Sequence, residues 1–354
     1  MTPRLIHAGA PARLRLLCAG PGVTIQDEGR RGYLRYGVTE AGPMDWTAFR
    51  TANLALGNES HAAAIEISLG GLRAICENGP LWIAYAGADF NWRRDGALLP
   101  PAARLLLQPG DSLTVRPGAM GAWTYLAVEG GFDTEPELGS RATHTRSSMG
   151  GVDGRMLREG DILPAAAPGS GGDRSEAIID AAWLRRTRDP IRVVPGPQDD
   201  YFDPSSLAAF FDEEFTLTPA ADRMAYRFEG PEIAHSRGYN IVSDGVALGA
   251  IQVAGDRRPL ILMADRQPTG GYPKLGHVIR ADIGRLAQSR PGERRRFAQV
   301  STVEARTALL ALEDEIAGIA SHMAPLRREP TSKLLLETNL IDGFTDALTD
   351  LASR

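Results

Sequence analysis

Short apolar stretches separated by turn sequences make up the first 165 residues. The apolar stretches have the length of strands: Ala74–Cys76, Leu81–Ala86, Leu105–Leu107, Leu113–Val115 and Tyr125–Val128. Turns rich in Gly, Pro, Asn and Asp lie between them. Many short strands at this spacing predict a β-barrel or sandwich rather than alternating strands and helices.

One segment of the first half has helical periodicity. Pro43–Leu56 places Met44, Phe49 and Ala52 on one face, and Gly57 ends it. Asp45 lies at the N-terminal end of this predicted helix, where a helix cap is the commoner role for an aspartate. Asp45 is therefore either a cap or a site residue.

The second half begins after a linker and ends in helices. Ala165–Ser175 is small and rich in Gly and Pro, which is typical of a linker. A second β-rich region follows, with a short helix predicted over Asp203–Phe211 and helices over Thr302–Ser321 and Leu334–Leu351. The predicted units are 1–165 and 176–303, each a β-barrel region, and a helical extension over 304–354.

Composition excludes several classes of function. A net charge of −5 argues against a nucleic-acid surface, which needs clustered positive charge. No apolar stretch approaches the roughly 20 residues that a membrane-spanning helix needs. Arginines interrupt the N-terminal apolar residues, so we predict no signal peptide. The two cysteines match no metal or redox spacing. These features predict a reducing, cytoplasmic location with no nucleic-acid or membrane partner.

The densest group of chemically varied side chains follows an apolar strand in the second half. Two glycines stand within it and can turn backbone N–H groups toward a ligand, as a cradle for an amide or carboxylate. The segment contains Asp265, Arg266, Thr269, Gly270, Gly271, Tyr272 and Lys274. The alternative is a tight hairpin whose polar residues only stabilise turns. We favour a site, because a hairpin alone does not require so many different polar groups.

Further polar residues stand within apolar surroundings. Gln252 lies in a predicted strand, and Glu66 and Asp89 need partners such as Arg30 or backbone N–H groups if they are buried. For any single one of these polar residues, a structural ion pair is at least as good an explanation as a functional site. Arg280 and Asp282 are a further predicted buried pair.

The chain has no motif of an autonomous catalytic centre. It lacks a phosphate-binding loop, HExxH, GxSxG and paired cysteines. The six histidines share no ligand spacing, so we expect structural or surface roles for them and no metal site.

Several segments together resemble one family over roughly residues 14–303, in order. They include VTIQDEGRRGY, GPMDW, GSRATHTRSSMGG, RMAYRFEGP and LMADRQPTGGYPKLGHVIRADIGRLAQSRPGE. They are similar to the biotin-dependent carboxyltransferase-like family, which comprises the C subunit of 5-oxoprolinase (allophanate hydrolase subunit 2), the kinase-inhibitor antagonist proteins and the matching region of urea carboxylase. The resemblance implies a mainly β fold with two cyclophilin-like β-barrel domains.

The resemblance implies one main function and two alternatives. The main one is the C subunit of an ATP-dependent 5-oxoprolinase, an amide hydrolase that acts on a lactam and needs a B subunit of related fold and an A subunit. The alternatives are a carboxyltransferase component that moves CO₂ from carboxybiotin to urea or another amide, and a non-catalytic antagonist of a kinase-inhibitor protein. ATP is then a ligand of the complex. Neither Lys274 nor Lys333, the only lysines, stands in a biotinylation setting, so we expect no covalent biotin.

The roles expected in a lactam-opening site follow from charge and hydrogen bonding. Asp265, Arg266 and Lys274 are the predicted catalytic residues. The predicted substrate-binding residues are Asp27, Arg30, Asp45, Gln252, Thr269, Gly270, Gly271 and Tyr272. We expect the Thr269–Lys274 hairpin to face Asp27, Arg30 and Asp45 of the first domain, since ligand sites favour domain interfaces. Lys274 is expected to be exposed, so that its replacement leaves folding intact.

Overall fold

The computed structural model describes residues 11–166, 175–185 and 187–326. The fold is mainly β and barrel-like, as predicted, with four α-helices among the described residues. The predicted Leu334–Leu351 helix and most of the predicted linker lie outside the described residues.

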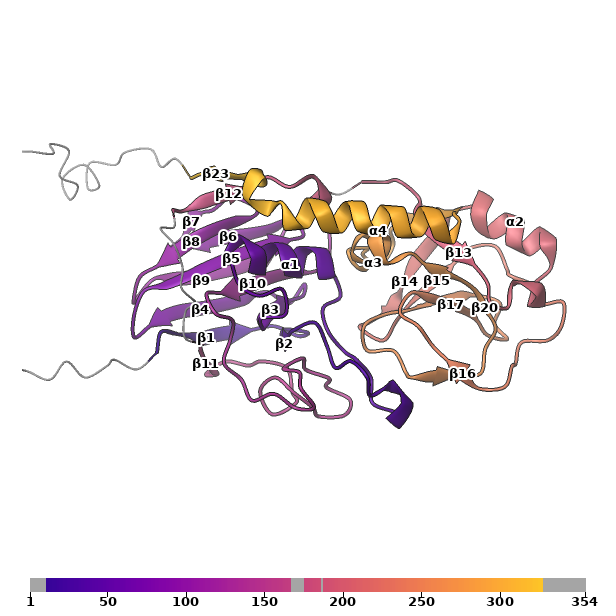
Figure 1. The fold of residues 1–354 in the computed structure, drawn as a ribbon, viewed down its shortest axis with the longest axis horizontal. Helices are drawn as coiled ribbons and strands as arrows, with labels where there is room; N and C mark the ends of the chain where they lie inside the picture. The colour runs from indigo at the N-terminus through magenta and orange to yellow at the C-terminus, as the bar shows by residue number, and fades with distance from the viewer. Residues whose placement is uncertain (1–10, 167–174, 186, 327–354) are drawn as a thin grey trace, which may run out of the picture.

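The first half forms two sheets that face each other and share a core (Figure 1). Alternate apolar side chains on the strands point between the sheets, and Tyr85 stacks on Trp92 there with ring centroids 4.0 Å apart. The strands are β1 (Arg13–Ala19), β2 (Thr24–Gln26), β3 (Ala64–Ile67), β4 (Leu72–Glu77), β5 (Leu81–Gly87), β6 (Phe90–Arg94), β7 (Ala97–Leu98), β8 (Ala103–Leu107), β9 (Ser112–Pro117), β10 (Thr124–Val128) and β11 (Ile162–Pro164).

The second half is built on one eight-stranded sheet around a cluster of phenylalanines. Phe210 and Phe297 stack there with ring centroids 4.6 Å apart. Two two-residue strands form a separate small ladder. The strands are β13 (Ile191–Pro195), β14 (Phe215–Ala221), β15 (Ala225–Glu229), β16 (Asp244–Gly245), β17 (Ala250–Val253), β18 (Pro259–Leu262), β19 (Thr269–Gly270), β20 (Lys274–Val278), β21 (Arg294–Arg295) and β22 (Phe297–Gln299).

Two further strands cross the predicted domain boundary. β12 (Ala177–Ile179) pairs with β8, and β23 (Met323–Pro325) pairs with β12. The seven-stranded sheet of the first half, called the first sheet below, therefore has the strand order β2-β3-β10-β5-β8-β12-β23. Sheet pairing places β12 and β23 with the first half, although the sequence assigned 177–179 to the second unit and 323–325 to a helical extension.

α1 (Trp46–Ala55) and α3 (Arg280–Ala287) lie where the two halves meet, α4 (Thr302–Ala317) runs along one side of both, and α2 (Pro204–Asp212) lies at the far end of the second half (Figure 1). α1 and α2 agree with the predicted helices. α4 begins at a capping box of Ser301 and Glu304, and it contacts α1, α3 and β13. α3 was not predicted from the sequence.

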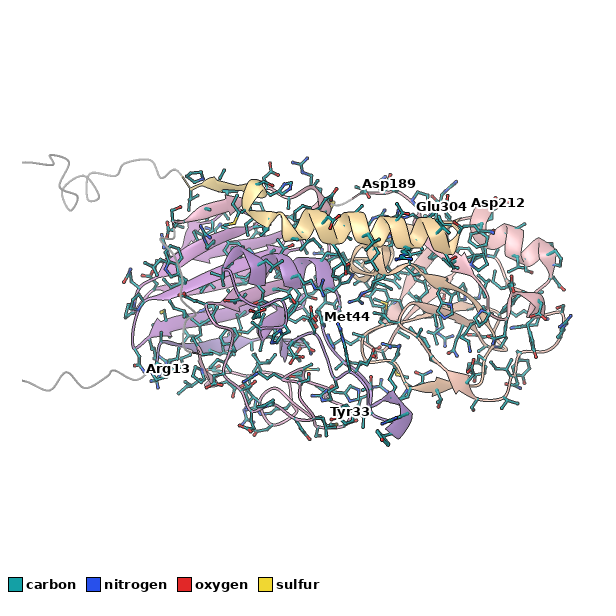
Figure 2. All side chains as sticks on the ribbon, in the orientation of Figure 1. Arg13, Tyr33, Met44, Asp189, Asp212 and Glu304 are labelled. Atoms are coloured by element: carbon teal, nitrogen blue, oxygen red, sulfur yellow. The ribbon has the colours of Figure 1, made fainter. Side chains whose placement is uncertain are left out.

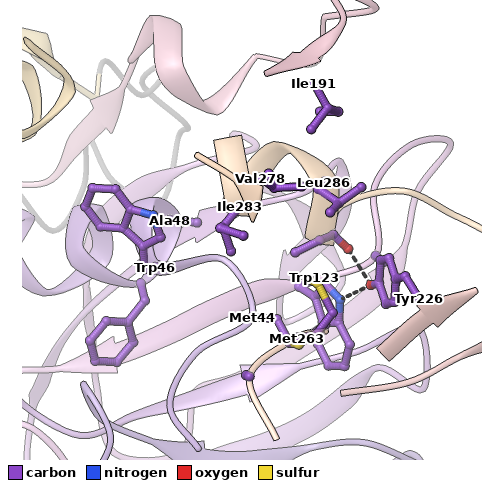
Figure 3. Close-up of a cluster of buried hydrophobic side chains, with 14 of the residues drawn as sticks. Met44, Trp46, Ala48, Trp123, Ile191, Tyr226, Met263, Val278, Ile283 and Leu286 are labelled. Carbon is purple, nitrogen blue, oxygen red and sulfur yellow. Dashed lines mark hydrogen bonds between the residues drawn. The ribbon is translucent and has the colours of Figure 1, made fainter. Parts of the chain in front are cut away.

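The interior between the halves is apolar and continuous. α1 and α3 pack against each other, and buried side chains from both halves belong to one cluster (Figure 3). It includes Trp46, Ala48, Ile191, Val278, Ile283 and Leu286. Gly284 allows this close approach, because a side chain there would collide with the carboxylate of Asp45.

Candidate functional site

A buried carboxylate of the first half meets a buried arginine of the second half. Glu66 lies on β3 with its side chain fully shielded from solvent, and the guanidinium of Arg223 donates a hydrogen bond to its Oε1. The backbone N–H of Met44 and the hydroxyl of Tyr125 donate to Oε2 at 2.8 and 2.7 Å. Burial raises the pKa of Glu66, and these three donors oppose the rise. Arg223 is therefore the partner of Glu66, where the sequence suggested Arg30.

Arg223 also holds the predicted catalytic residue Asp265. Its Nε and Nη2 donate to Asp265 Oδ2 and Oδ1 at 2.9 and 2.8 Å, and Nη2 donates to the carbonyl of Gly42 at 2.7 Å. Burial lowers the pKa of Arg223, but the charges of Asp265 and Glu66 outweigh it and the pKa is raised. Arg223 thus joins three separate parts of the chain: Gly42 before α1, Glu66 on β3, and Asp265.

The same arginine and aspartate line a cleft between the two halves. Its volume is about 660 Å³, and residues of the first half, such as Trp123 and Arg146, face Arg223, Met224 and Asp265 across it. The floor is fixed by hydrogen bonds: the indole N–H of Trp123 donates to Tyr226 Oη at 3.2 Å, and Tyr226 donates to the carbonyl of Ala287 at 2.7 Å (Figure 3). A cleft of this size between rigid elements can hold a small molecule.

Two buried nitrogen atoms near Asp265 have no hydrogen-bond partner among the described residues. They are Nη1 of Arg30, which is 1% exposed, and Nε2 of His144, which is 5% exposed. The carboxylate of Asp265 acts electrostatically on both side chains. Loss of hydration lowers the pKa of His144, so the imidazole favours its neutral form. An unpaired buried donor is costly, and a polar ligand would remove that cost.

Asp27 and Arg30, predicted to bind substrate, are fixed by the 137–142 segment. Asp27 accepts hydrogen bonds from Ser140 Oγ at 2.6 Å and from the Arg141 N–H at 2.5 Å. Arg30 donates to the carbonyls of Glu137 and Ala142 at 3.1 and 2.5 Å. Both side chains therefore fix the 137–142 segment, and Nη1 of Arg30 keeps no hydrogen-bond partner among the described residues.

Asp45 is the N-cap of α1. Its Oδ1 accepts from the backbone N–H groups of Thr47 and Ala48 at 3.2 and 3.1 Å, and Gln288 Nε2 donates to its Oδ2 at 2.7 Å. Met44, beside it, lies between the two halves (Figure 2). Oδ1 of Asp45 therefore caps α1, and Oδ2 joins α1 to Gln288 of the second half.

Arg266 joins a loop of the first half to the second. Its Nη2 donates to Glu40 Oε2 at 2.7 Å, and its Nε donates to the carbonyl of Val246 at 3.1 Å. The carbonyl of Arg266 accepts a hydrogen bond from Thr39 Oγ1 at 3.0 Å. The side chain is 4% exposed. Arg266 therefore holds the chain segment before α1 in place.

Lys274 is buried, and the expectation of an exposed lysine was wrong. It lies on β20 with its side chain 2% exposed, because β17 and the 196–198 turn flank it, and its Nζ donates to Asp244 Oδ2 at 2.8 Å. That hydrogen bond lowers the pKa of Asp244. A buried ammonium with one carboxylate partner retains hydrogen-bonding capacity for a ligand.

The predicted binding residues of the hairpin surround Lys274. Thr269 and Gly270 form β19, which pairs with β16 and so places Asp244 opposite Gly270. Gly270 lies against the buried amide of Gln252, whose Oε1 has no partner among the described residues. Gly271 accepts from the Ile241 N–H at 2.8 Å, and Tyr272 is 39% exposed. No hydrogen bond among the described residues connects this hairpin to Asp27, Arg30 or Asp45.

The expectation for Asp282 needs correction, whereas Asp89 has a partner of an expected kind, a backbone N–H. Asp282 is fully buried on α3 but pairs with Arg192 at 2.7 Å and Arg285 at 3.2 Å, not with Arg280, because the helix directs positions 280 and 282 to different sides. Asp89 is exposed at a turn, where it accepts from the Ala119 N–H at 3.1 Å.

Sequence reasoning missed Arg223, Tyr125 and His144. Arg223 begins one of the segments that carry the family resemblance, but a single arginine before a strand has no local signal of burial. Its role depends on Glu66, 157 positions away. The only available signal was Glu66 itself, a carboxylate in an apolar strand that requires a cationic partner.

Comparison with known proteins decides the family. The model of the family described as "Carboxyltransferase domain, subdomain A and B" matches residues 36–299. The chain belongs to this family. It is 36% identical to the C subunit of 5-oxoprolinase from Escherichia coli (strain K12) over 295 residues, which are 83% of this chain and 94% of that protein. It is 37% identical to the corresponding 5-oxoprolinase protein of Haemophilus influenzae, over 83% of this chain and 92% of that protein.

A solved structure of a larger protein is similar along 92% of this chain. It is the urea amidolyase of K. lactis, with a TM-score of 0.82 and 27% identity. The match covers 92% of this chain but 21% of the urea amidolyase. This chain therefore corresponds to about a fifth of that larger protein and to nearly the full length of the two bacterial relatives.

Two findings on the part of the chain that the structure describes concern metal-binding clusters and helices that could span a membrane. Nowhere in residues 11–166, 175–185 and 187–326 do three or more His, Cys, Asp or Glu side chains gather as a metal site would require. Every helix in these ranges is too short or too polar to cross a bilayer.

Proposed function

We propose that this chain is the C subunit of an ATP-dependent 5-oxoprolinase complex, which opens the lactam of 5-oxoproline to give glutamate. The observation that carries the proposal is the extent of similarity to the two bacterial proteins: 36% and 37% identity over 94% and 92% of their lengths. Because those relatives are named as one component of a multi-component enzyme, we propose the A and B subunits of 5-oxoprolinase as the partners of this chain. Because the reaction uses ATP, we propose a cytoplasmic complex.

The proposed reaction is difficult because the lactam carbonyl is stabilised by resonance with its nitrogen. Transfer of the terminal phosphoryl group of ATP to the carbonyl oxygen makes that oxygen a leaving group. Water then adds to the carbonyl carbon and the C–N bond breaks, with the ring nitrogen taking a proton to become the amine, which leaves an acyl phosphate. A second water hydrolyses the acyl phosphate to a carboxylate and inorganic phosphate. ATP, two water molecules and 5-oxoproline are thus converted into ADP, phosphate and glutamate. The site must stabilise negative charge that develops on oxygen.

We propose that Lys274 supplies this stabilisation. Its ammonium is buried, which strengthens its interaction with a developing oxyanion, and the free Oε1 of Gln252 nearby can accept from a lactam N–H. The amides of Gly270 and Gly271 and the side chains of Thr269 and Tyr272 complete the proposed binding hairpin. In the same proposal Asp265, which lines the cleft between the two halves, orders the site together with the buried side chains of Arg266, Asp27, Arg30 and Asp45.

The purified chain is expected to release no glutamate from 5-oxoproline and ATP by itself. No phosphate-binding loop is recognisable in its sequence, so we propose that ATP binds on a partner protein. The measurement is ATP-dependent glutamate release by the chain alone, by the A and B subunits together, and by all three. Activity only in the three-component mixture agrees with the proposal. Robust release by the chain alone would contradict it.

Carboxyl transfer is the second candidate, because the family model describes a carboxyltransferase domain and the K. lactis neighbour is a urea amidolyase. It requires carboxybiotin from another protein. The same purified complex distinguishes the two: carboxylation of urea in the presence of a carboxylated biotin carrier, without glutamate release from 5-oxoproline, would replace our proposal with this one.

A further inference from the structure

The indole of Trp46 lies close to two guanidinium groups where the first turns of α1 and α3 meet. The Cζ atoms of Arg50 and Arg280 lie 5.2 and 5.0 Å from the centre of its ring. The indole N–H donates to the carbonyl of Arg280 at 3.0 Å. A guanidinium over an aromatic face is attracted to the π electrons while its N–H donors stay free. Trp46 therefore holds Arg280 in place without using its hydrogen-bonding capacity.

Carboxylates neutralise the other arginines of this region but not Arg280. Arg50 pairs with Glu28 at 2.7 Å and Arg31 with the same Glu28 at 3.3 Å. Arg266 pairs with Glu40 at 2.7 Å, and Arg50 also lies 3.7 Å from Glu313. Among the described residues, no ion pair or hydrogen bond involves the guanidinium of Arg280. Three carboxylates thus face four guanidinium groups, and Arg280 is the group without a counter-charge.

The electrostatic surroundings of Arg280 favour an added anion. Loss of hydration lowers the pKa of Arg280 to about 10, and repulsion from Arg50, Arg31 and Arg266 contributes, while only Glu28 acts in the opposite direction. Arg280 is still cationic at pH 7. Solvent reaches its side chain, so a dissolved ligand can reach it as well. Because Arg280 is exposed, water solvates its guanidinium when no ligand is bound, and an oxyanion that enters this group of arginines meets an excess of positive charge.

We propose that Arg280, held by Trp46 and supported by Arg50, is a binding site for the oxyanion group of a small molecule, a carboxylate or a phosphate. The planar guanidinium can donate two parallel hydrogen bonds to either group. This site involves neither the cleft around Arg223 nor the Lys274 hairpin, so it goes beyond the proposed lactam chemistry and stands whether or not that chemistry is correct.

The test uses the full chain and two simple anions, acetate and inorganic phosphate, titrated separately at constant ionic strength. The readout is the NMR signal of the Trp46 indole N–H, which donates a hydrogen bond to the carbonyl of Arg280. The signal is assigned as the one that disappears in Trp46→Phe. We expect a saturable shift of this signal in the unmodified chain with at least one of the anions. Arg280→Gln should weaken the binding by at least about 10-fold, because the charge-assisted pair is lost.

Two further variants make the result decisive. Arg280→Lys keeps the charge but not the planar fork, so it should bind more tightly than Arg280→Gln and more weakly than the unmodified chain. Arg294→Gln changes an exposed arginine on β21 and should leave binding unchanged. Tighter binding of acetate or of phosphate identifies which group the site prefers. No saturable shift with either anion, or equal affinity in Arg280→Gln, overturns the proposal.

Discussion

Replacing Arg223 with methionine is expected to lower the free energy of unfolding by about 3–5 kcal/mol, because it leaves two buried carboxylates without their cation. Glu66 is fully buried and Asp265 is 8% exposed, and Arg223 donates hydrogen bonds to both. Methionine keeps much of the apolar length, so the change removes mainly charge and hydrogen bonds. Urea denaturation followed by circular dichroism measures the effect as a change in midpoint at constant slope.

Arg227→Met is the matched control. Arg227 lies four residues later in the same segment and pairs with Asp256, but the two side chains are 43% and 40% exposed. An exposed pair is worth less than about 1 kcal/mol. Equal losses in the two variants would mean that the Arg223 network adds nothing beyond a surface ion pair.

The loss caused by Arg223→Met should depend on pH. Burial already raises the pKa of Glu66, and Arg223 opposes that rise, so the pKa climbs further without the arginine. Below about pH 4.3, the pKa of a glutamate in the unfolded chain, the carboxyl group of Glu66 is neutral in both the folded and the unfolded state, so its burial costs no stability through charge. The penalty grows as pH rises toward the folded-state pKa and is complete above it. The difference from the unmodified chain should therefore be smaller near pH ~5 than near pH ~7.5.

Replacing Lys274 with methionine is expected to lower ATP-dependent glutamate release by the reconstituted complex about 100-fold, as loss of a buried oxyanion-stabilising group does. Methionine matches the length of the lysine stem and tolerates a buried position, which alanine would leave partly empty. The rate with saturating 5-oxoproline is the measurement, and the unfolding free energy of the variant shows whether the fold is intact.

Lys333→Met serves as the control, since it removes the only other lysine of the chain. A second comparison, Asp244→Asn, removes the carboxylate partner of Lys274 but leaves the ammonium. We expect Lys333→Met to keep the full rate and Asp244→Asn to lose less activity than Lys274→Met. Similar, nearly unchanged rates for Lys274→Met and Lys333→Met would show that Lys274 is a structural residue of the hairpin.

The elements with strong local signals could be predicted from the sequence. Short apolar runs bounded by Gly/Pro turns specify strands such as β5 and β10, and the periodic Pro43–Leu56 segment specifies α1. α3 gave no such signal, since it has eight residues with a glycine inside and neither a side-chain N-cap nor a glycine after it. Its position depends on burial of Ile283 and Leu286 against the first half, which is a tertiary effect.

The candidate site could be predicted only in part, because local sequence does not encode pairing between distant segments. The 262–274 segment stands out by its own polar residues. Its surroundings do not: Asp244 reaches Lys274 through the pairing of β16 with β19, and Glu66 reaches Arg223 across the two halves. The isolated lysine also gave no sign of its burial, which results from neighbouring backbone on both sides of β20.

The pairing of β23 with β12 has a consequence for how the chain folds during its synthesis on the ribosome. The second barrel, residues 191–299, lies in the sequence between these two strands of the first sheet. During synthesis the first sheet reaches its full width only after residue 325 has left the exit tunnel. Until then β12 is an open edge, and unpaired strand edges recruit other chains. Nascent chains that stall within the second barrel would therefore be the form most exposed to aggregation.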